Sequence, residues 1–186
     1  MINIINFIQH WFGAESEKYW EQIELEVCWG FQIQPGIKWK EGLSEQQLND
    51  FQKKLRLQFP ESLKNFYKMM NGLDKPGLNN NGNEKDVEFS PTFYSYPDDI
   101  EKMKSKIQWI LEDNAVTNEA IRELNIPSIV PYYAHRFLII DKEELVLSMY
   151  GSDIIFWADN LSKGVATDIF HNRYKVDTVK VDANSF

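Results

Sequence analysis

The chain has 186 residues, of which 43% are hydrophobic and 14% aromatic, and its formal net charge is −8 at pH 7. This composition excludes a disordered chain and suits a single domain over residues 1–186 with a sizeable core. The charge argues against a nucleic-acid binder, which needs a basic surface for phosphates, and against binding to an anionic membrane. No apolar run approaches the roughly 20 residues of a membrane span. An acidic surface suits a basic protein partner, although acidity also serves solubility alone.

Cysteine usage and the first residues indicate the compartment. The single cysteine, Cys28, excludes an internal disulfide framework and suits a reducing environment. Residues 1–12 are apolar but lack the basic start and the small-residue cleavage site of a signal peptide. We therefore expect a cytoplasmic protein.

Residues 1–42 are expected to form an N-terminal helical extension. Residues 3–11 and 15–29 both place apolar side chains at helical spacing, which predicts helix in each. Pro35 and Gly36 then break the chain before the next predicted helix.

Residues 43–72 predict two short helices separated by a proline. Ser44 is a good N-cap, and Gln47 three residues later completes a capping box. Pro60 suits the first turn of the second helix, and Asn-Gly at 71–72 is predicted to end it because glycine accepts a left-handed conformation. The two apolar stripes consist of Leu48, Phe51 and Leu55, then Leu63, Phe66, Tyr67 and Met70.

The middle of the chain alternates loop, strand and helix signals. Residues 72–86 are rich in Gly and Asn and predict a loop, and residues 87–95 predict an interrupted strand. Helical patterns follow at residues 100–111 and 117–124, each preceded by a residue that can cap it.

The last third of the chain is dominated by short β patterns with tight connections. Such connections predict an antiparallel meander, followed by a helix at residues 160–170 and an edge strand at 174–181. The fold class is therefore α+β, with an antiparallel or mixed sheet of about four to six strands flanked by helices. The predicted strands of the meander cover residues 130–133, 137–140, 145–149 and 154–157.

Three motifs carry a resemblance to a known family. The motifs are Leu-Gln-Phe-Pro-Glu-Ser-Leu-Lys-Asn-Phe-Tyr at 57–67 with Asn-Gly at 71–72, Ile-Val-Pro-Tyr-Tyr-Ala-His-Arg-Phe-Leu at 129–138, and Leu-Ser-Met-Tyr-Gly-Ser-Asp-Ile-Ile-Phe-Trp at 147–157. With them the chain resembles the SMI1/KNR4 family, also called the SUKH superfamily, over roughly residues 43–170, and residues 171–186 follow as a C-terminal tail. It departs from the usual pattern where Phe59 replaces a leucine before the proline and Leu63 replaces a common tyrosine.

The resemblance implies an α+β domain that acts by binding another protein. Bacterial members are taken as immunity proteins that neutralise toxins, many of them nucleases, whereas fungal members are scaffold-like regulators of cell-wall synthesis. Neither role requires a catalytic site or a cofactor. Because a fold does not define a function, both roles stay open: toxin neutralisation, and regulation of an endogenous partner.

Candidate chemistry is sparse. The three histidines, His10, His135 and His171, have no second ligand at metal-binding spacing, so we expect no metal site. No serine or cysteine lies in a nucleophile motif, and no glycine-rich phosphate loop is present, so we expect no catalytic residues and no cofactor. An enzyme with an unfamiliar site around His135 remains a third possibility.

One polar cluster is a candidate for partner binding. His135 and Arg136 open one predicted strand, and Ser152 and Asp153 open another, so a meander brings them to one end of the sheet. They either anchor a protein partner, together with Tyr133, or serve the fold through an ion pair between Arg136 and Asp153. Aromatic residues along these strands are expected to be mostly buried, with outward ones available to a partner; they are Tyr132, Tyr133, Tyr150, Phe156 and Trp157.

Overall fold

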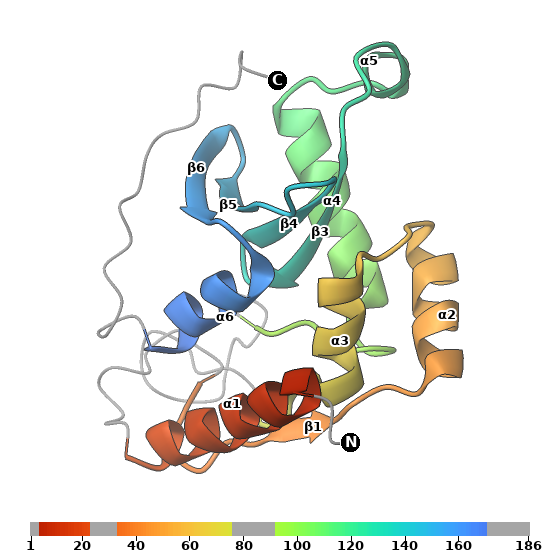
Figure 1. The fold of residues 1–186 in the computed structure, drawn as a ribbon. Helices are drawn as coiled ribbons and strands as arrows, with labels where there is room; N and C mark the ends of the chain where they lie inside the picture. Colours follow the sequence, from red (N-terminus) through yellow and green to blue (C-terminus); the bar gives the residue numbers. More distant parts are fainter. Residues whose placement is uncertain (1–3, 23–32, 76–91, 171–186) are drawn as a thin grey trace.

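The protein is an α+β fold in which helices lie on both faces of a four-stranded antiparallel sheet (Figure 1). The computed structural model describes residues 4–22, 33–75 and 92–170. Within these ranges no helix is both long and apolar enough to cross a membrane. The helices are α1 (Ile4–Glu21), α2 (Glu45–Leu55), α3 (Glu61–Met69), α4 (Ile100–Asp113), α5 (Asn118–Glu123) and α6 (Leu161–Phe170). The strands are β1 (Trp39–Glu41), β2 (Met70–Leu73), β3 (Ser128–Tyr133), β4 (Arg136–Ile140), β5 (Val146–Tyr150) and β6 (Asp153–Ala158).

The main sheet is a meander with strand order β3-β4-β5-β6 and antiparallel pairing throughout. Short turns connect consecutive strands, as the tight spacing predicts, and all four expected strands are confirmed. The register places Leu138 opposite Val146 and Phe137 opposite Leu147. Because side chains alternate along a strand, these two pairs face opposite sides of the sheet.

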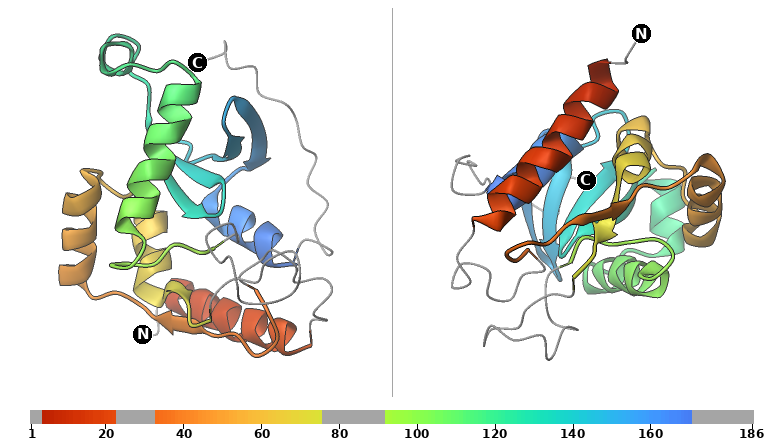
Figure 2. Two further views of the ribbon diagram at one scale, coloured as in Figure 1. Left: turned by 180° about the vertical axis from the view of Figure 1, so that it is seen from behind. Right: turned by 90° about the horizontal axis from the view of Figure 1, so that it is seen from below.

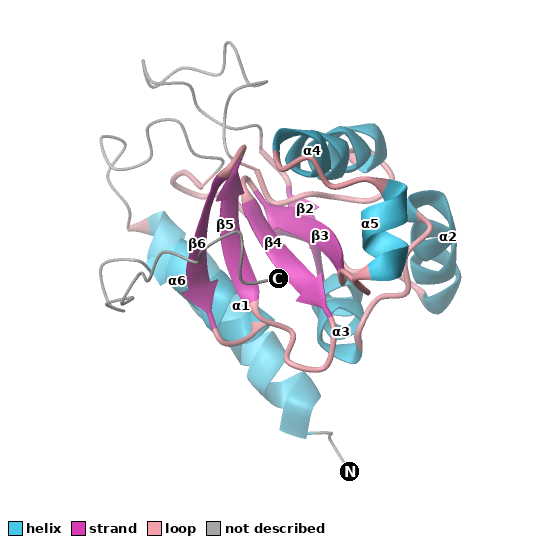
Figure 3. Ribbon diagram, turned by 90° about the horizontal axis from the view of Figure 1, so that it is seen from above, coloured by secondary structure: helices cyan, strands magenta, loops and turns pink. Residues whose placement is uncertain are grey.

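The two faces of the sheet are covered differently (Figure 3). On one face Leu138 and Val146 belong to a large core that includes Val165 and Ile169 of α6 and extends to α1, α2 and α3. On the other face a smaller cluster packs beneath the C-terminal half of α4, where Ile110 is buried. This second layer is thinner, and it contains the pocket described below.

Helix α2 begins as the sequence predicts. The Ser44 hydroxyl accepts a hydrogen bond from the Gln47 backbone at 3.3 Å, and the Gln47 side chain accepts one from the Ser44 backbone at 2.9 Å. This reciprocal capping box satisfies backbone N–H groups that the first helical turn leaves unpaired. Phe51 of α2 is fully buried, so the cap fixes a helix that contributes to the core.

The role expected for the Asn-Gly pair was wrong. Helix α3 ends at Met69, and the chain passes directly into β2, which contains Asn71 and Gly72. The Asn71 side chain donates to the Tyr96 carbonyl at 2.7 Å and accepts from the Tyr96 N–H at 2.8 Å. Gly72 has φ +74°, and an added β-carbon would lie 2.6 Å from Cβ of Ser95. The pair therefore joins β2 to the segment before α4, which local pattern does not reveal.

Helix α1 is one continuous helix through Gly13 rather than two segments. It packs on the same side of the molecule as α6 (Figure 2), where Phe170 contacts both Phe12 and Tyr19 with ring centroids 5.9 and 5.1 Å apart. Trp20 is fully buried. Predictions for residues 23–29, 76–91 and 174–181 lie outside the described residues.

Candidate protein-binding site

Arg136, at the start of β4, is held inside the protein by three neighbours. Its Nε donates to Asp168 Oδ1 at 3.1 Å, and its Nη1 donates to Ser148 Oγ at 2.6 Å. The guanidinium also lies 3.5 Å from the centre of the Trp157 ring, within cation–π range. Only 13% of the Arg136 side chain and 1% of the Asp168 side chain are exposed. The arginine therefore serves as an internal anchor between the sheet and α6.

The ion pair expected between Arg136 and Asp153 was wrong. Asp153 is exposed at the first position of β6, opposite Tyr150, whereas the partner of Arg136 comes from the next helix. A signal for Asp168 was present in the sequence, because it follows Leu161 and Val165 on the buried stripe of α6. A carboxylate at a core position of an amphipathic helix needs a buried cation or donors.

The Asp168 carboxylate is surrounded by donors. Tyr132 donates to its Oδ2 at 2.7 Å. Burial raises the pKa of Asp168 to about 7, and this effect is opposed by the Arg136 charge and by donors on Tyr132 and Arg136, with the Trp157 indole close by. The same burial and the nearby carboxylate raise the pKa of Tyr132. Asp168, Tyr132 and Arg136 are joined by these hydrogen bonds, whereas the buried Nε1 of Trp157 has no hydrogen-bond partner among the described residues. The bonds support a structural role for the network.

The C-terminal end of β5, beside His135, carries an exposed aromatic side chain, Tyr150. The ring of Tyr150 lies 5.2 Å from that of Trp109 on α4 and 6.1 Å from that of His135, both edge to face. Lys106 lies over the Trp109 ring at 4.8 Å. Burial lowers the pKa of His135 to about 4, with further lowering by Arg136 and Lys106, so its ring is neutral at physiological pH.

The five residues predicted for partner binding do gather at one end of the sheet, but they differ in exposure. Ser152 and Asp153 are exposed, His135 and Arg136 are partly covered, and Tyr133 is buried against Phe93. In the wider aromatic group, Tyr132 is also buried, Phe156 and Trp157 are half-buried, and Tyr150 is exposed. A binding role for these residues stays a prediction.

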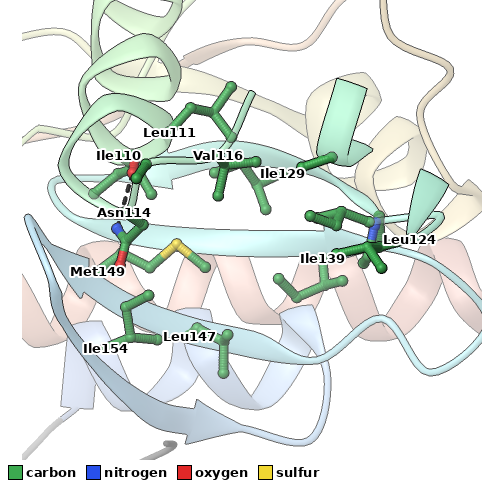
Figure 4. Close-up of a pocket in the computed structure, with 14 residues that line it drawn as sticks. Ile110, Leu111, Asn114, Val116, Leu124, Ile129, Ile139, Leu147, Met149 and Ile154 are labelled. Atoms are coloured by element: carbon green, nitrogen blue, oxygen red, sulfur yellow. Dashed lines mark hydrogen bonds between the residues drawn. The ribbon is translucent and has the colours of Figure 1, made fainter. Parts of the chain in front are cut away.

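A second surface feature, which the sequence did not indicate, is an apolar groove of about 360 Å³ on the α4 face of the sheet (Figure 4). Its only polar side chain is Asn114, which donates to the carbonyls of Ile110 at 2.8 Å and Gly151 at 3.1 Å. No titratable side chain lines the groove. The main apolar contributors are Ile110, Val116, Leu124, Ile139, Met149 and Ile154.

The side chains that could bind a metal ion are scattered in the described part of the chain. Across residues 4–22, 33–75 and 92–170, no three His, Cys, Asp or Glu side chains are grouped so as to hold a metal ion. Two other features of these residues are the exposed ring of Tyr150 and the apolar groove.

Comparison with known proteins agrees with the motifs. No curated protein matches the chain. The profile of the SMI1 / KNR4 family (SUKH-1) matches residues 42–186, which contain all three motifs, the whole main sheet and every described helix except α1. The chain therefore belongs to the SMI1 / KNR4 family (SUKH-1).

Proposed function

We propose that this chain is a non-catalytic protein-binding domain, and that it acts in the cytoplasm as an immunity protein that neutralises a toxin by direct binding. Its membership of the SMI1 / KNR4 family supports a binding role. The observation that carries the proposal is the apolar groove on the α4 face, which is a concave surface without a titratable side chain.

The lining of this groove favours binding over catalysis. A catalytic pocket normally combines apolar walls with convergent polar groups of perturbed pKa. Here the one polar side chain, Asn114, has its amide N–H groups committed to two backbone carbonyls. His135, which would centre an enzyme site, is packed against Tyr150 and lies beside the enclosed Arg136.

The proposed mechanism is steric occlusion assisted by charge. A nuclease toxin presents a basic surface to its substrate, and a partner with net charge −8 is attracted to such a surface. Contact across the apolar groove then supplies the short-range part of the binding free energy.

Co-expression with the toxin encoded beside the gene tests the proposal. We expect the chain to restore growth of cells that produce the toxin, and to co-purify with a catalytically inactive variant of it. No protection against any neighbouring toxin, together with no complex, would contradict the proposal. Co-purification with an endogenous protein, in the absence of protection, would instead support the scaffold or regulatory role.

A further inference from the structure

Helix α5 does not fully bury any of its side chains. None of the residues Asn118–Glu123 is buried, although a surface helix ordinarily buries one apolar face against the core. Leu124, which directly follows the helix, is 65% exposed. Ala120 and Leu124 nevertheless line the groove together with residues of α4 and the sheet, and Leu124 is labelled in Figure 4.

The floor of the groove and its α4 side are apolar and buried. Ile139, Leu147 and Met149 form the floor and are buried members of the α4-face cluster, to which Ile110 of α4 also belongs. The volume of about 360 Å³ lies near the lower end of the range of roughly 300–1,000 Å³ for ligand sites. The flexible Met149 side chain lets such a surface adapt to the shape of an apolar partner.

The segment that supplies most of the groove lining is acidic. Residues 110–127, which supply most of the lining, carry four acidic side chains and one basic side chain, giving a net charge of −3. All five are exposed, and the one cation, Arg122, pairs with Glu119 at 3.1 Å. The acidic residues are Glu112, Asp113, Glu119 and Glu123. The segment that supplies most of the lining therefore combines apolar side chains in the groove with exposed carboxylates next to them in the sequence.

We propose that this groove binds an amphipathic helix of the protein partner, with its apolar side chains in the groove and its Lys or Arg side chains paired with the exposed carboxylates of residues 110–127. The inference rests on the proposed function in that the occupant belongs to the bound protein. A helix suits the site because the groove lies on the face of the sheet, whereas an added strand pairs with a free sheet edge. Helical ligands of this kind insert apolar anchors spaced three and four residues apart.

Two synthetic peptides test the chemistry of the occupant on the full chain. One is a fluorescein-labelled amphipathic helix of leucine and lysine, and the other has glutamate in place of every lysine. We expect saturable binding of the lysine peptide by fluorescence anisotropy, weakening as salt is added, and no binding of the glutamate peptide. Equal binding of both peptides, or of neither, would overturn the proposal.

A pair of matched variants locates the binding surface. Leu124→Ser removes an apolar side chain from the groove, and Tyr150→Ser removes a similarly exposed one, 66% against 65%, from outside it. We expect Leu124→Ser to weaken peptide binding at least about tenfold, because it removes apolar surface that the bound peptide would bury, and Tyr150→Ser to leave it unchanged. The reverse order would place the site at the sheet end and overturn the proposal.

A charge reversal tests the contribution of the acidic residues separately from that of the apolar lining. Glu123→Lys should weaken binding of the lysine peptide and reduce its salt dependence, whereas Glu101→Lys on the first turn of α4 should not. A wild-type chain that dimerises in solution, and that Leu124→Ser makes monomeric, would assign the groove to a second copy and contradict the proposal.

The same variants distinguish this inference from the proposed function. If the wild type protects cells from a toxin and both Leu124→Ser and Glu123→Lys protect equally well, the groove proposal fails while the immunity role stands. If no toxin is neutralised but the lysine peptide binds with the expected variant pattern, the groove proposal stands while the immunity role fails. Circular dichroism confirms that each variant is folded, which exposed positions favour.

Discussion

Gly164 on α6 lies so close to Tyr132 on β3 that a β-carbon added at Gly164 would sit 2.6 Å from the tyrosine hydroxyl oxygen. The hydroxyl passes the helix backbone at this point and reaches Asp168 at 2.7 Å. The absence of a side chain at position 164 therefore permits the hydrogen bond that holds α6 to the sheet.

This contact predicts that Gly164→Ala destabilises the protein by about 1–3 kcal/mol, because the methyl group displaces Tyr132 or moves α6. Tyr132→Phe alone should cost about 1–3 kcal/mol, because the Asp168 carboxylate loses a donor. The double variant should be less destabilised than the two single effects added together, because phenylalanine relieves part of the clash. Urea unfolding of the four chains measures this coupling, and strict additivity would contradict it.

Arg136→Ala should destabilise the protein by roughly 3 kcal/mol, because it leaves the buried Asp168 carboxylate without its cation. Arg122→Ala is the matched control: that side chain is 73% exposed, and its pair with Glu119 should contribute at most about 1 kcal/mol. Thermal and urea unfolding compare the two. An Arg136→Ala chain as stable as the wild type, but unable to bind its partner, would show that the arginine is functional instead.

His135 should titrate with a midpoint near pH 4 in the folded chain, because burial, Arg136 and Lys106 disfavour its cation. An unfolded histidine titrates near pH 6.5. The unfolded state therefore binds more protons between these values, and the contribution of His135 to stability is full above about pH 6.5 and lost as the pH falls toward 4.

Ring NMR signals, assigned with His135→Gln, measure that midpoint. The stability of the wild type relative to His135→Gln should fall from pH 7 to pH 4.5, since other groups affect both chains alike. A midpoint near 6.5 would mean that the ring is solvated, and the pH-dependent difference would then be absent.

Ser44→Ala should cost about 1 kcal/mol, because the first turn of α2 loses the acceptor of its capping box. Ser105→Ala, at an exposed position inside α4, is the control and should be neutral or slightly stabilising, since alanine is the better helix former. Equal unfolding midpoints in urea for Ser44→Ala and the wild type would show that the cap contributes nothing.

Short-range features of this fold are readable from the sequence, and the α2 cap shows why. Ser44 and Gln47 are three residues apart, so their interaction depends only on local geometry. The meander strands follow from the same logic, because each turn is short and the β patterns are clear. The turn between β5 and β6 could therefore be predicted, and so could the shared sheet end of His135 and Asp153.

The contacts that define the site depend on long-range packing, which spacing does not encode. Asp168 is 32 residues from Arg136, and the two meet only because α6 folds back across the sheet. The groove is harder still to predict. Leu124 and Ile129 look alike in the sequence as core residues, yet in the structure Ile129 is buried whereas Leu124 is 65% exposed, and both line the groove.

The packing of α1 has a consequence for where the protein can be divided. The family profile begins at residue 42, yet Trp20 is fully buried and contacts Trp39, while Phe170 at the end of α6 contacts both Phe12 and Tyr19. The segment that the family profile matches is therefore shorter than the segment that packs together in the structure. A fragment that begins at residue 42 would lack both α1 and Trp39, so Phe66 would lose its contact with Trp39 and Phe170 its contacts with α1. We therefore expect the unit that unfolds cooperatively to begin upstream of the segment that the family profile matches.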